Sequence, residues 1–237
     1  MLSKKRQIYQ RRFKPICGND PFYISISSGK FAPSFAQRFA SRATLYAAQI
    51  EKLLHNLKKN KNLNITKTTN ENIADLLSKN FIIARFFGRS EAGPRALGHR
   101  SFIASPNKKN LRNIMNKVKK REWYRPFAPI ILKSEAKNVL ENVLNNSYYM
   151  NTSSVIKEEW RERLNGVIHE DNSTRPQLID KNSSKDLLEI VNIFYKKTGI
   201  PAILNTSFNV NEPLVETPQH AIDTFLKLPP EVKYLQL

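Results

Sequence analysis

Short apolar runs alternate with amphipathic segments of helical period between residues 69 and 226. The apolar runs are typical of strands covered on both faces, and they predict strands at 81–87, 101–104, 127–132, 166–168 and 201–204, with a further strand near Tyr148. The amphipathic segments predict helices at 69–77, 111–118, 134–143, 158–163, 187–199 and 217–226. This alternation predicts an α/β fold in which helices flank a sheet.

The first 65 residues do not share this alternation. Residues 1–40 show no clean period, whereas apolar side chains between 46 and 57 fall on one helical face, and a polar run at 58–64 ends that pattern. The sequence therefore predicts a helical or disordered N-terminal extension. We expect it to cover 1–65, partly disordered with one helix near 41–59, and to precede one domain over 66–237.

The charge of the chain is strongly positive. It has 39 Lys and Arg against 20 Asp and Glu, a formal net charge of +19 and a pI of about 10.0. A field of this size favours anionic partners, which include nucleic acid, an anionic membrane surface and phosphate-bearing small molecules. A composition rich in Lys and Asn raises the charge in the same way without a binding role, so charge alone leaves these classes open.

Cysteine usage and hydropathy bear on the compartment. Cys17 is the single cysteine, which excludes an intramolecular disulfide and is the usage expected of a reducing cytosol. No apolar run approaches the roughly 20 residues of a membrane span, so we expect a cytoplasmic protein without a membrane partner. Residues 1–50 hold nine Lys and Arg and one acid, a composition shared by organellar transit peptides and by lysine-rich tails.

Residues 86–105, FFGRSEAGPRALGHRSFIAS, hold three of the seven glycines and three arginines between two expected strands. Glycine lets backbone N–H groups approach an anion closely, and an arginine fork binds carboxylate or phosphate oxygens at two points. The segment is therefore a candidate oxyanion cradle. Its glycine spacing fits neither a Walker loop nor a dinucleotide-binding loop, and a tight turn with solvated arginines is the alternative.

Three further polar segments follow apolar runs. Residues 117–127 interleave basic and aromatic side chains, which suits a nucleic-acid face, a phosphate clamp or a solvated basic run. Residues 169–177, HEDNSTRPQ, suit a binding loop or a surface turn. Residues 205–209, NTSFN, follow a buried strand at the kind of position where α/β folds place ligands, although a capping turn uses the same residues.

Together these four segments resemble a known family. GRSEAGPRALGHRS, VKKREWYRPFAP, HEDNSTRPQ and LNTSFNVNEPLVETP occur in the order and at the distances of the C-terminal domain of the NodU-type O-carbamoyltransferases of nodulation-factor and antibiotic biosynthesis. The resemblance covers about residues 70–225, roughly two thirds of the chain. The last dozen residues, which include KLPPEVKYLQL, leave the pattern.

The resemblance implies a YrdC-like fold, a twisted mixed sheet with flanking helices, whose basic concave face binds ATP and carbamoyl phosphate. It implies formation of carbamoyl-adenylate with release of pyrophosphate, with Mg²⁺ accompanying the ATP. The motif positions imply Arg95, Lys119 and Arg175 as catalytic residues. Further substrate- or nucleotide-binding residues are implied at Gly93, Arg121, Arg125, Asn205, Thr206 and Ser207.

The family also carries an N-terminal ASKHA-type domain that binds a metal and transfers the carbamoyl group to a hydroxyl acceptor. Residues 1–65 do not show the Gly-, Asp- and Ala-rich segment that precedes the C-terminal domain. We therefore expect either a free-standing subunit that works with a separate ASKHA-type partner or a non-catalytic remnant. A basic nucleic-acid-binding module is the other alternative, but phosphate-backbone binding needs no fixed spacing of the third and fourth motifs.

Overall fold

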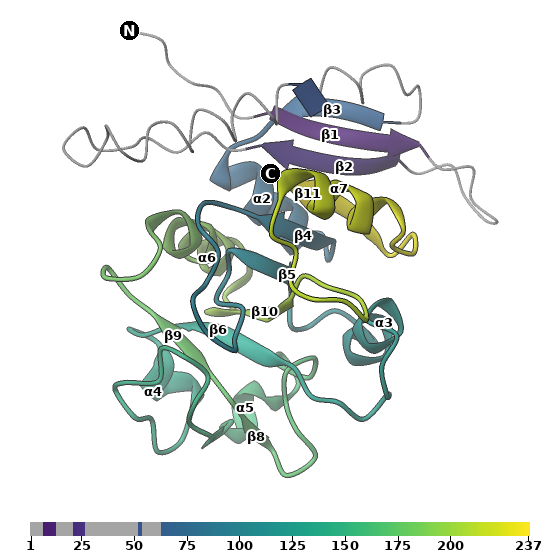
Figure 1. Ribbon diagram of the computed structural model, residues 1–237. Coiled ribbons are helices and arrows are strands. Elements are labelled where there is room, and N and C mark those ends of the chain that lie inside the picture. Colours follow the sequence, from purple (N-terminus) through teal and green to yellow (C-terminus); the bar gives the residue numbers. More distant parts are fainter. Residues whose placement is uncertain (1–6, 13–20, 27–51, 54–62) are drawn as a thin grey trace, which may run out of the picture.

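The computed structural model describes residues 7–12, 21–26, 52–53 and 63–237 (Figure 1). Within these residues nine strands form one mixed sheet in the order β1-β3-β2-β11-β4-β5-β10-β6-β9, and β7 and β8 form a separate antiparallel pair. The strands are β1 (Gln7–Arg12), β2 (Pro21–Ile26), β3 (Leu63–Lys67), β4 (Ile82–Phe86), β5 (Arg100–Ala104), β6 (Ala128–Leu132), β7 (Ser154–Val155), β8 (Ser173–Thr174), β9 (Gln177–Ile179), β10 (Ala202–Ser207) and β11 (Val232–Gln236).

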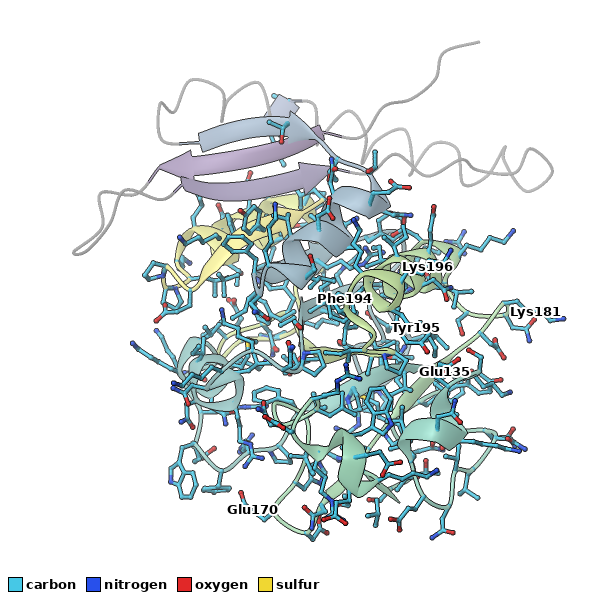
Figure 2. All side chains as sticks on the ribbon, turned by 180° about the vertical axis from the view of Figure 1, so that it is seen from behind. Glu135, Glu170, Lys181, Phe194, Tyr195 and Lys196 are labelled. Atoms are coloured by element: carbon cyan, nitrogen blue, oxygen red, sulfur yellow. The ribbon has the colours of Figure 1, made fainter. Side chains whose placement is uncertain are left out.

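Helices flank this sheet. They are α2 (Asn70–Ser78), α3 (Leu111–Val118), α4 (Ala136–Val139), α5 (Glu158–Arg161), α6 (Lys185–Thr198) and α7 (Pro218–Leu226). In α6 the apolar positions Leu187, Ile190, Val191 and Phe194 repeat at helical spacing and are buried, whereas Lys196 points into solvent (Figure 2). The α6 helix packs against α2. Among the described helices none is long and apolar enough to cross a bilayer.

The central strands confirm the mixed α/β sheet that the apolar runs predict. Every residue of β4, β5 and β6 is buried, as expected of strands covered on both faces. Neighbouring pairs β4–β5, β5–β10 and β10–β6 are antiparallel, whereas β6–β9 is parallel.

The strand directions bring four loops to one end of the sheet. Phe86, the last residue of β4, pairs with Arg100, the first residue of β5. Ser207 at the end of β10 pairs with Ser101, and the first residue of β6 pairs with Asn205 two positions earlier. The β9 strand runs parallel to β6 and begins at Gln177. The segments before β5, β6 and β9 and the segment after β10 therefore meet at this end, and they contain the four motifs.

Some predicted elements are absent or shorter. Residues 166–168 and the segment at Tyr148 form no strand; short strands lie instead at 154–155, 173–174 and 177–179. Val167 lies in a turn, and its apolar side chain is buried in the core. The helix expected over 134–143 ends at Val139, because Leu140 is extended and bridges Ile156.

Both ends of the chain contain strands that the periodicity of the sequence did not predict. Although residues 1–40 show no clean period, β1 and β2 within them join the sheet. Strand β11 follows α7 and runs parallel to β2 on one side and β4 on the other. Residues 52–53 are helical, and the rest of the helix expected near 41–59 lies outside the described residues, as does most of the segment expected to be disordered.

Candidate functional site at one end of the sheet

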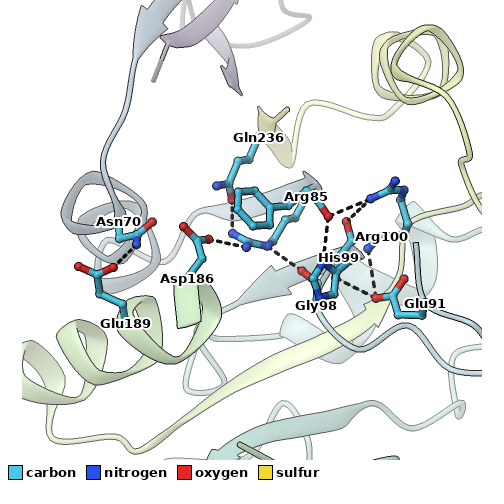
Figure 3. Close-up of polar contacts among 10 residues, drawn as sticks. Asn70, Arg85, Glu91, Gly98, His99, Arg100, Asp186, Glu189 and Gln236 are labelled. Carbon is cyan, nitrogen blue, oxygen red and sulfur yellow. Dashed lines mark hydrogen bonds and ion pairs between the residues drawn. The ribbon is translucent and has the colours of Figure 1, made fainter. Parts of the chain in front are cut away.

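A buried arginine fixes one side of the loop that connects β4 to β5. The Arg85 side chain is fully buried, and its Nε donates to the Gly98 carbonyl oxygen at 2.6 Å (Figure 3). Its Nη1 donates to Gln236 Oε1 at 2.5 Å, and its Nη2 pairs with Asp186 Oδ2 at 2.5 Å. The guanidinium of this β4 residue thus contacts the loop, strand β11 and the first turn of α6, and it ties the loop to both elements.

An acid inside the same loop provides a second anchor. Glu91 Oε1 accepts the backbone N–H groups of Leu97 at 2.6 Å, His99 at 2.8 Å and Arg100 at 3.3 Å. Backbone N–H groups that converge in this way form a site for negative charge, and here the loop supplies the carboxylate itself. Glu91 therefore holds the C-terminal half of the loop in shape.

Arg100 and Gly98 of the first motif both maintain the shape of the loop, for different reasons. The Arg100 guanidinium donates to the carbonyl oxygens of Phe87 at 3.1 Å and Gly88 at 3.0 Å, and it stacks on the Phe86 ring at 3.6 Å from the centroid. Gly98 has φ +105°, and a Cβ there would lie 2.5 Å from Leu187 Cδ2. This position therefore requires glycine.

The other half of the loop is open. Gly93 and Arg95 are exposed, and a Cβ at Gly93 would meet no atom within 4 Å. The Arg95 guanidinium makes no hydrogen bond or ion pair within the described part of the chain. The loop is thus anchored at residues 96–100, and just before them it presents the Arg95 cation, which has no partner among the described residues.

Lys119 joins the second motif to the fourth. It follows the last residue of α3, it is 8% exposed, and its Nζ lies 2.6 Å from the Ser207 carbonyl oxygen and 3.0 Å from Ser207 Oγ. The same Nζ lies 3.1 Å from the Asn209 carbonyl oxygen and 2.9 Å from Asn209 Oδ1. Burial, and secondarily the nearby Arg121 charge, lower the pKa of Lys119 to about 7.

The two arginines of the second motif have partners within their own segment. Arg121 Nε donates to Asn116 Oδ1 at 2.7 Å, and its guanidinium stacks on the Phe127 ring at 4.3 Å. Burial, followed by the charge of Arg125, lowers the pKa of Arg121 to about 10. Arg125 is exposed and pairs with Glu122 at 2.8 Å. Both cations therefore shape the turn before β6.

Between these two arginines lie two exposed aromatic residues. Trp123 is 70% exposed and Tyr124 is 59% exposed, and their rings meet edge to face at 6.0 Å between centroids. The Trp123 carbonyl oxygen accepts from Asn116 Nδ2 at 2.8 Å. The backbone of this turn is therefore fixed while its two rings stay in solvent.

Asn205 and Gln177 tie the fourth and third motifs to the first. Asn205 Nδ2 donates to the Ala96 carbonyl oxygen and to Gln177 Oε1, both at 2.8 Å. Gln177 Nε2 donates to the Leu97 carbonyl oxygen at 2.9 Å. The first, third and fourth motifs are thus hydrogen-bonded to one another. The second motif contacts the fourth through Lys119.

Arg175 lies half-buried directly after β8, and it makes no hydrogen bond or ion pair within the described residues. Burial first, and then the positive charge of Arg175, lower the pKa of His169. Thr206, the residue between Asn205 and Ser207, is half-buried and pairs with Phe102 across the sheet.

The structure therefore brings Lys119 onto Ser207 directly, whereas neither Arg95 nor Arg175 contacts them through a hydrogen bond or an ion pair within the described residues. Sequence reasoning missed Glu91 and Gln177. The available signal was a lone acid in a basic, glycine-rich segment, and an amide directly before the apolar residues Leu178 and Ile179.

Comparison with known proteins gives this geometry a context. The sequence model of the family described as "Carbamoyltransferase C-terminus" matches residues 74–237. The chain is 43% identical over 158 residues to an uncharacterised protein of Methanocaldococcus jannaschii, covering 66% of this chain and 30% of that protein. It is 40% identical over 157 residues to the nodulation protein NolNO of Sinorhizobium fredii, covering 65% and 23%. The chain thus spans less than a third of the length of these relatives.

A solved structure shares the fold at low sequence identity. E. coli YciO has a TM-score of 0.50 and 13% identity, over 70% of this chain and 76% of that chain. A P. abyssi Sua5 variant has a TM-score of 0.49 and 12% identity, over 70% and 45%. The YrdC-like mixed sheet with flanking helices is confirmed. The expectation that the last dozen residues leave the family pattern is wrong, because the family match reaches residue 237 and these residues include β11.

Proposed function

This chain belongs to the carbamoyltransferase C-terminus family, and from that premise we propose that it binds ATP and carbamoyl phosphate and forms carbamoyl-adenylate. The observation that carries the proposal is the meeting of four motifs at one end of the sheet. Lys119 contacts Ser207 there, and Arg95 and Arg175 reach the same end without a partner among the described residues.

This set of side chains suits two anionic substrates. ATP and carbamoyl phosphate repel each other, and the repulsion must be cancelled before the reacting atoms can meet. Fixed cations cancel it, and they also stabilise the charge that develops on phosphate oxygens in the transition state. In the proposal Arg95 and Arg175 bind phosphate oxygens, and Lys119 adds a third positive charge once an anion raises its pKa.

The proposed reaction needs no side-chain nucleophile. Water cleaves carbamoyl phosphate to carbamate and phosphate. A carbamate oxygen then forms a bond to the α-phosphorus of ATP while the bond from that phosphorus to pyrophosphate breaks. The products are carbamoyl-adenylate and pyrophosphate. The protein contributes positioning and charge stabilisation, which are the main terms in phosphoryl-transfer catalysis.

Mg²⁺ enters the proposal as part of the ATP substrate. Within the described residues no group of three or more His, Cys, Asp or Glu side chains could hold a metal ion. The proposal therefore assigns the ion to the phosphate oxygens, where it would offset part of their charge.

Transfer of the carbamoyl group to a hydroxyl acceptor is assigned to another protein region. The relatives are more than three times as long as the matched segment, which supports a division of labour. In the proposal an ASKHA-type domain outside the matched segment, or a partner subunit that carries one, performs the transfer. ATP as a substrate and the single cysteine fit a cytoplasmic location.

Isotope exchange tests the proposal. With ATP, Mg²⁺ and freshly dissolved carbamoyl phosphate, the folded chain should incorporate labelled pyrophosphate into ATP, and omission of carbamoyl phosphate should abolish the exchange. Absence of exchange in a folded sample, alone or with an ASKHA-type partner, would contradict the proposal. The nucleic-acid alternative, which the exposed Trp123 and Tyr124 favour, predicts instead tight duplex binding that falls steeply with salt.

A further inference from the structure

The loop of the third motif carries three hydrogen-bonded side chains that have no role in the reaction described above. His169 Nδ1 lies 3.2 Å from Ser173 Oγ, and the Ser173 backbone N–H donates to Asp171 Oδ1 at 3.0 Å. The Ser173 hydroxyl also donates to Asp171, and these two hydrogen bonds, the hydroxyl first, lower the pKa of the Asp171 carboxyl. The three residues thus connect in the order Asp171, Ser173, His169.

These hydrogen bonds determine which nitrogen of His169 carries the proton. An ionised carboxylate can only accept, so the single hydrogen of the Ser173 hydroxyl points to Asp171. Ser173 Oγ can then only accept from the imidazole, which makes Nδ1 of His169 the donor. The lone pair of the neutral ring is therefore on Nε2.

The loop and a neighbouring helix hold this arrangement in place. The His169 backbone N–H donates to the Ser173 carbonyl oxygen at 2.8 Å, which closes the turn between them. Arg112 of α3 donates to the Ile168 carbonyl oxygen and pairs with Glu170 at 2.7 Å (Figure 2). The residues on either side of His169 are thus tied to α3.

Nε2 of His169 is buried and has no hydrogen-bond partner among the described residues. Buried polar atoms are nearly always paired, and a catalytic role is one explanation for an exception. Catalytic hydrogen bonds commonly become short and aligned only in the complex with substrate. An imidazole with one nitrogen fixed by a hydrogen bond and a lone pair on the other has the form of a general base.

The surroundings of His169 keep the ring neutral. Burial, followed by the charge of Arg175, lowers the pKa of His169, while Asp171 acts in the opposite direction and Arg112 adds to the lowering. At neutral pH the ring is thus in the form that takes up a proton. It lies near the arginine that binds phosphate oxygens in the proposed function.

We propose that His169 is the general base for the cleavage of carbamoyl phosphate by water, and that Ser173 and Asp171 position it. The proposal rests on the proposed function, which requires carbamate from carbamoyl phosphate. The water oxygen forms a bond to the carbonyl carbon while one water proton passes to Nε2. The bond from that carbon to the bridging oxygen then breaks, and the phosphate leaves with the electron pair and receives the proton from His169. The carbamic acid that remains loses a proton to solvent and becomes carbamate.

Two assays on the full chain with ATP and Mg²⁺ separate this step from the next. Release of inorganic phosphate from carbamoyl phosphate, corrected for the spontaneous reaction, measures the cleavage. Exchange of labelled pyrophosphate into ATP with freshly dissolved ammonium carbamate measures adenylation alone. We expect His169→Gln to lower phosphate release by about 10²–10⁴-fold, the usual contribution of a general base, and to change the carbamate-supported exchange less than about twofold. His220→Gln, at a histidine of α7, is the control and should retain both activities.

Ser173 provides a second pair of variants. Ser173→Ala removes the hydroxyl that fixes the tautomer of His169, so phosphate release should fall by about tenfold or more. Ser173→Thr retains a hydroxyl and should recover most of this activity. Neither substitution should change the carbamate-supported exchange, because adenylation of carbamate needs no base at this position.

A folded His169→Gln variant with full phosphate release would overturn the assignment of His169, and so would an equal loss in both assays, which indicates a purely structural role. If His169→Gln does not fold, the two Ser173 variants decide, since equal phosphate release by both would contradict the proposal. An unaltered chain that exchanges pyrophosphate with carbamate but releases no phosphate contradicts only this inference. An unaltered chain that is inactive in both assays contradicts the proposed function itself.

Discussion

Lys119 Nζ lies 2.6 Å from the carbonyl oxygen of Ser207 and 3.0 Å from its hydroxyl oxygen, and no carboxylate pairs with it among the described residues. Neutral oxygens hold the amine in place without neutralising its charge. Its pKa is lowered to about 7 by burial and by Arg121. The Lys119 amine is therefore already in position for an anion, and it would take up a proton when the anion binds.

This relationship predicts a pH dependence of binding. Above about pH 7.5 phosphate groups are fully ionised, so changes in affinity for ATP report the protein. We expect the affinity to fall as the pH rises to 9.5, by up to about tenfold per pH unit while Lys119 is neutral in the free chain and protonated in the complex. Lys119→Arg, whose guanidinium stays charged, should show a nearly flat profile. Parallel profiles for the two proteins would contradict this role for Lys119.

Lys119 also predicts a pH dependence of stability. Its pKa is about 7 in the folded chain and about 10.4 when unfolded, so the unfolded state binds more protons between these values. Stability contributed by this residue therefore rises with pH, by up to about 1.4 kcal/mol per pH unit from pH 7 to pH 10. Urea denaturation of the unaltered chain and of Lys119→Met across this range should give free energies of unfolding that diverge with this slope. A constant difference would contradict the burial of a neutral amine.

The buried cation Arg85 predicts a large loss of stability. Arg85→Met removes the 2.5 Å ion pair with the Asp186 carboxylate and the contacts to Gly98 and Gln236 (Figure 3). We expect the free energy of unfolding to fall by about 3–5 kcal/mol.

Glu170→Ala is the matched control for a surface ion pair, since the Glu170 side chain is 86% exposed where it pairs with Arg112 (Figure 2). It should cost about 0–1 kcal/mol. Equal losses in urea denaturation would show that the Arg85 cluster does not stabilise the fold.

Glu91 predicts a local effect on the first motif. Glu91→Ala leaves the amides of Leu97 and His99 without their acceptor, at a cost of about 1.5–3 kcal/mol for hydrogen bonds to a charged group. Hydrogen exchange at residues 97–100 should accelerate, while the exchange of β6 residues should change little. Glu158→Ala, at an exposed acid in α5, is the control. Unchanged protection at 97–100 would show that other contacts hold the loop.

The parts of the fold that could be predicted are those fixed by local pattern. The runs at 81–87 and 101–104 are continuously apolar because β4 and β5 are buried on both faces. Strand β11 could not be found in this way, since its sequence VKYLQ mixes polar and apolar residues. Gln236 is polar and buried because it accepts from Arg85, a partner 151 positions away.

The residues of the candidate site likewise include some that the sequence could predict and some that it could not. Lys119 and Ser207 could be named because their motifs resemble a known family, and the structure joins them. The roles of Glu91 and Gln177 depend on which backbone N–H and carbonyl groups the folded loop leaves unpaired, and a sequence does not show these. Arg85 looked like an ordinary strand residue, because nothing near it in sequence indicates its buried partners.

The most direct measurement is ATP titration of five single variants by calorimetry. Arg95→Ala, Lys119→Ala and Arg175→Ala each remove a cation at the end of the sheet where the motifs meet, and each should weaken ATP binding by about ten- to a hundredfold, as expected for loss of a charge-assisted contact. Lys109→Ala and Lys137→Ala remove equal charge at exposed positions elsewhere, and they should change the affinity less than about twofold. If the two controls lose as much affinity as the three site variants, binding is a diffuse effect of the net charge of +19, and the four motifs do not form one site.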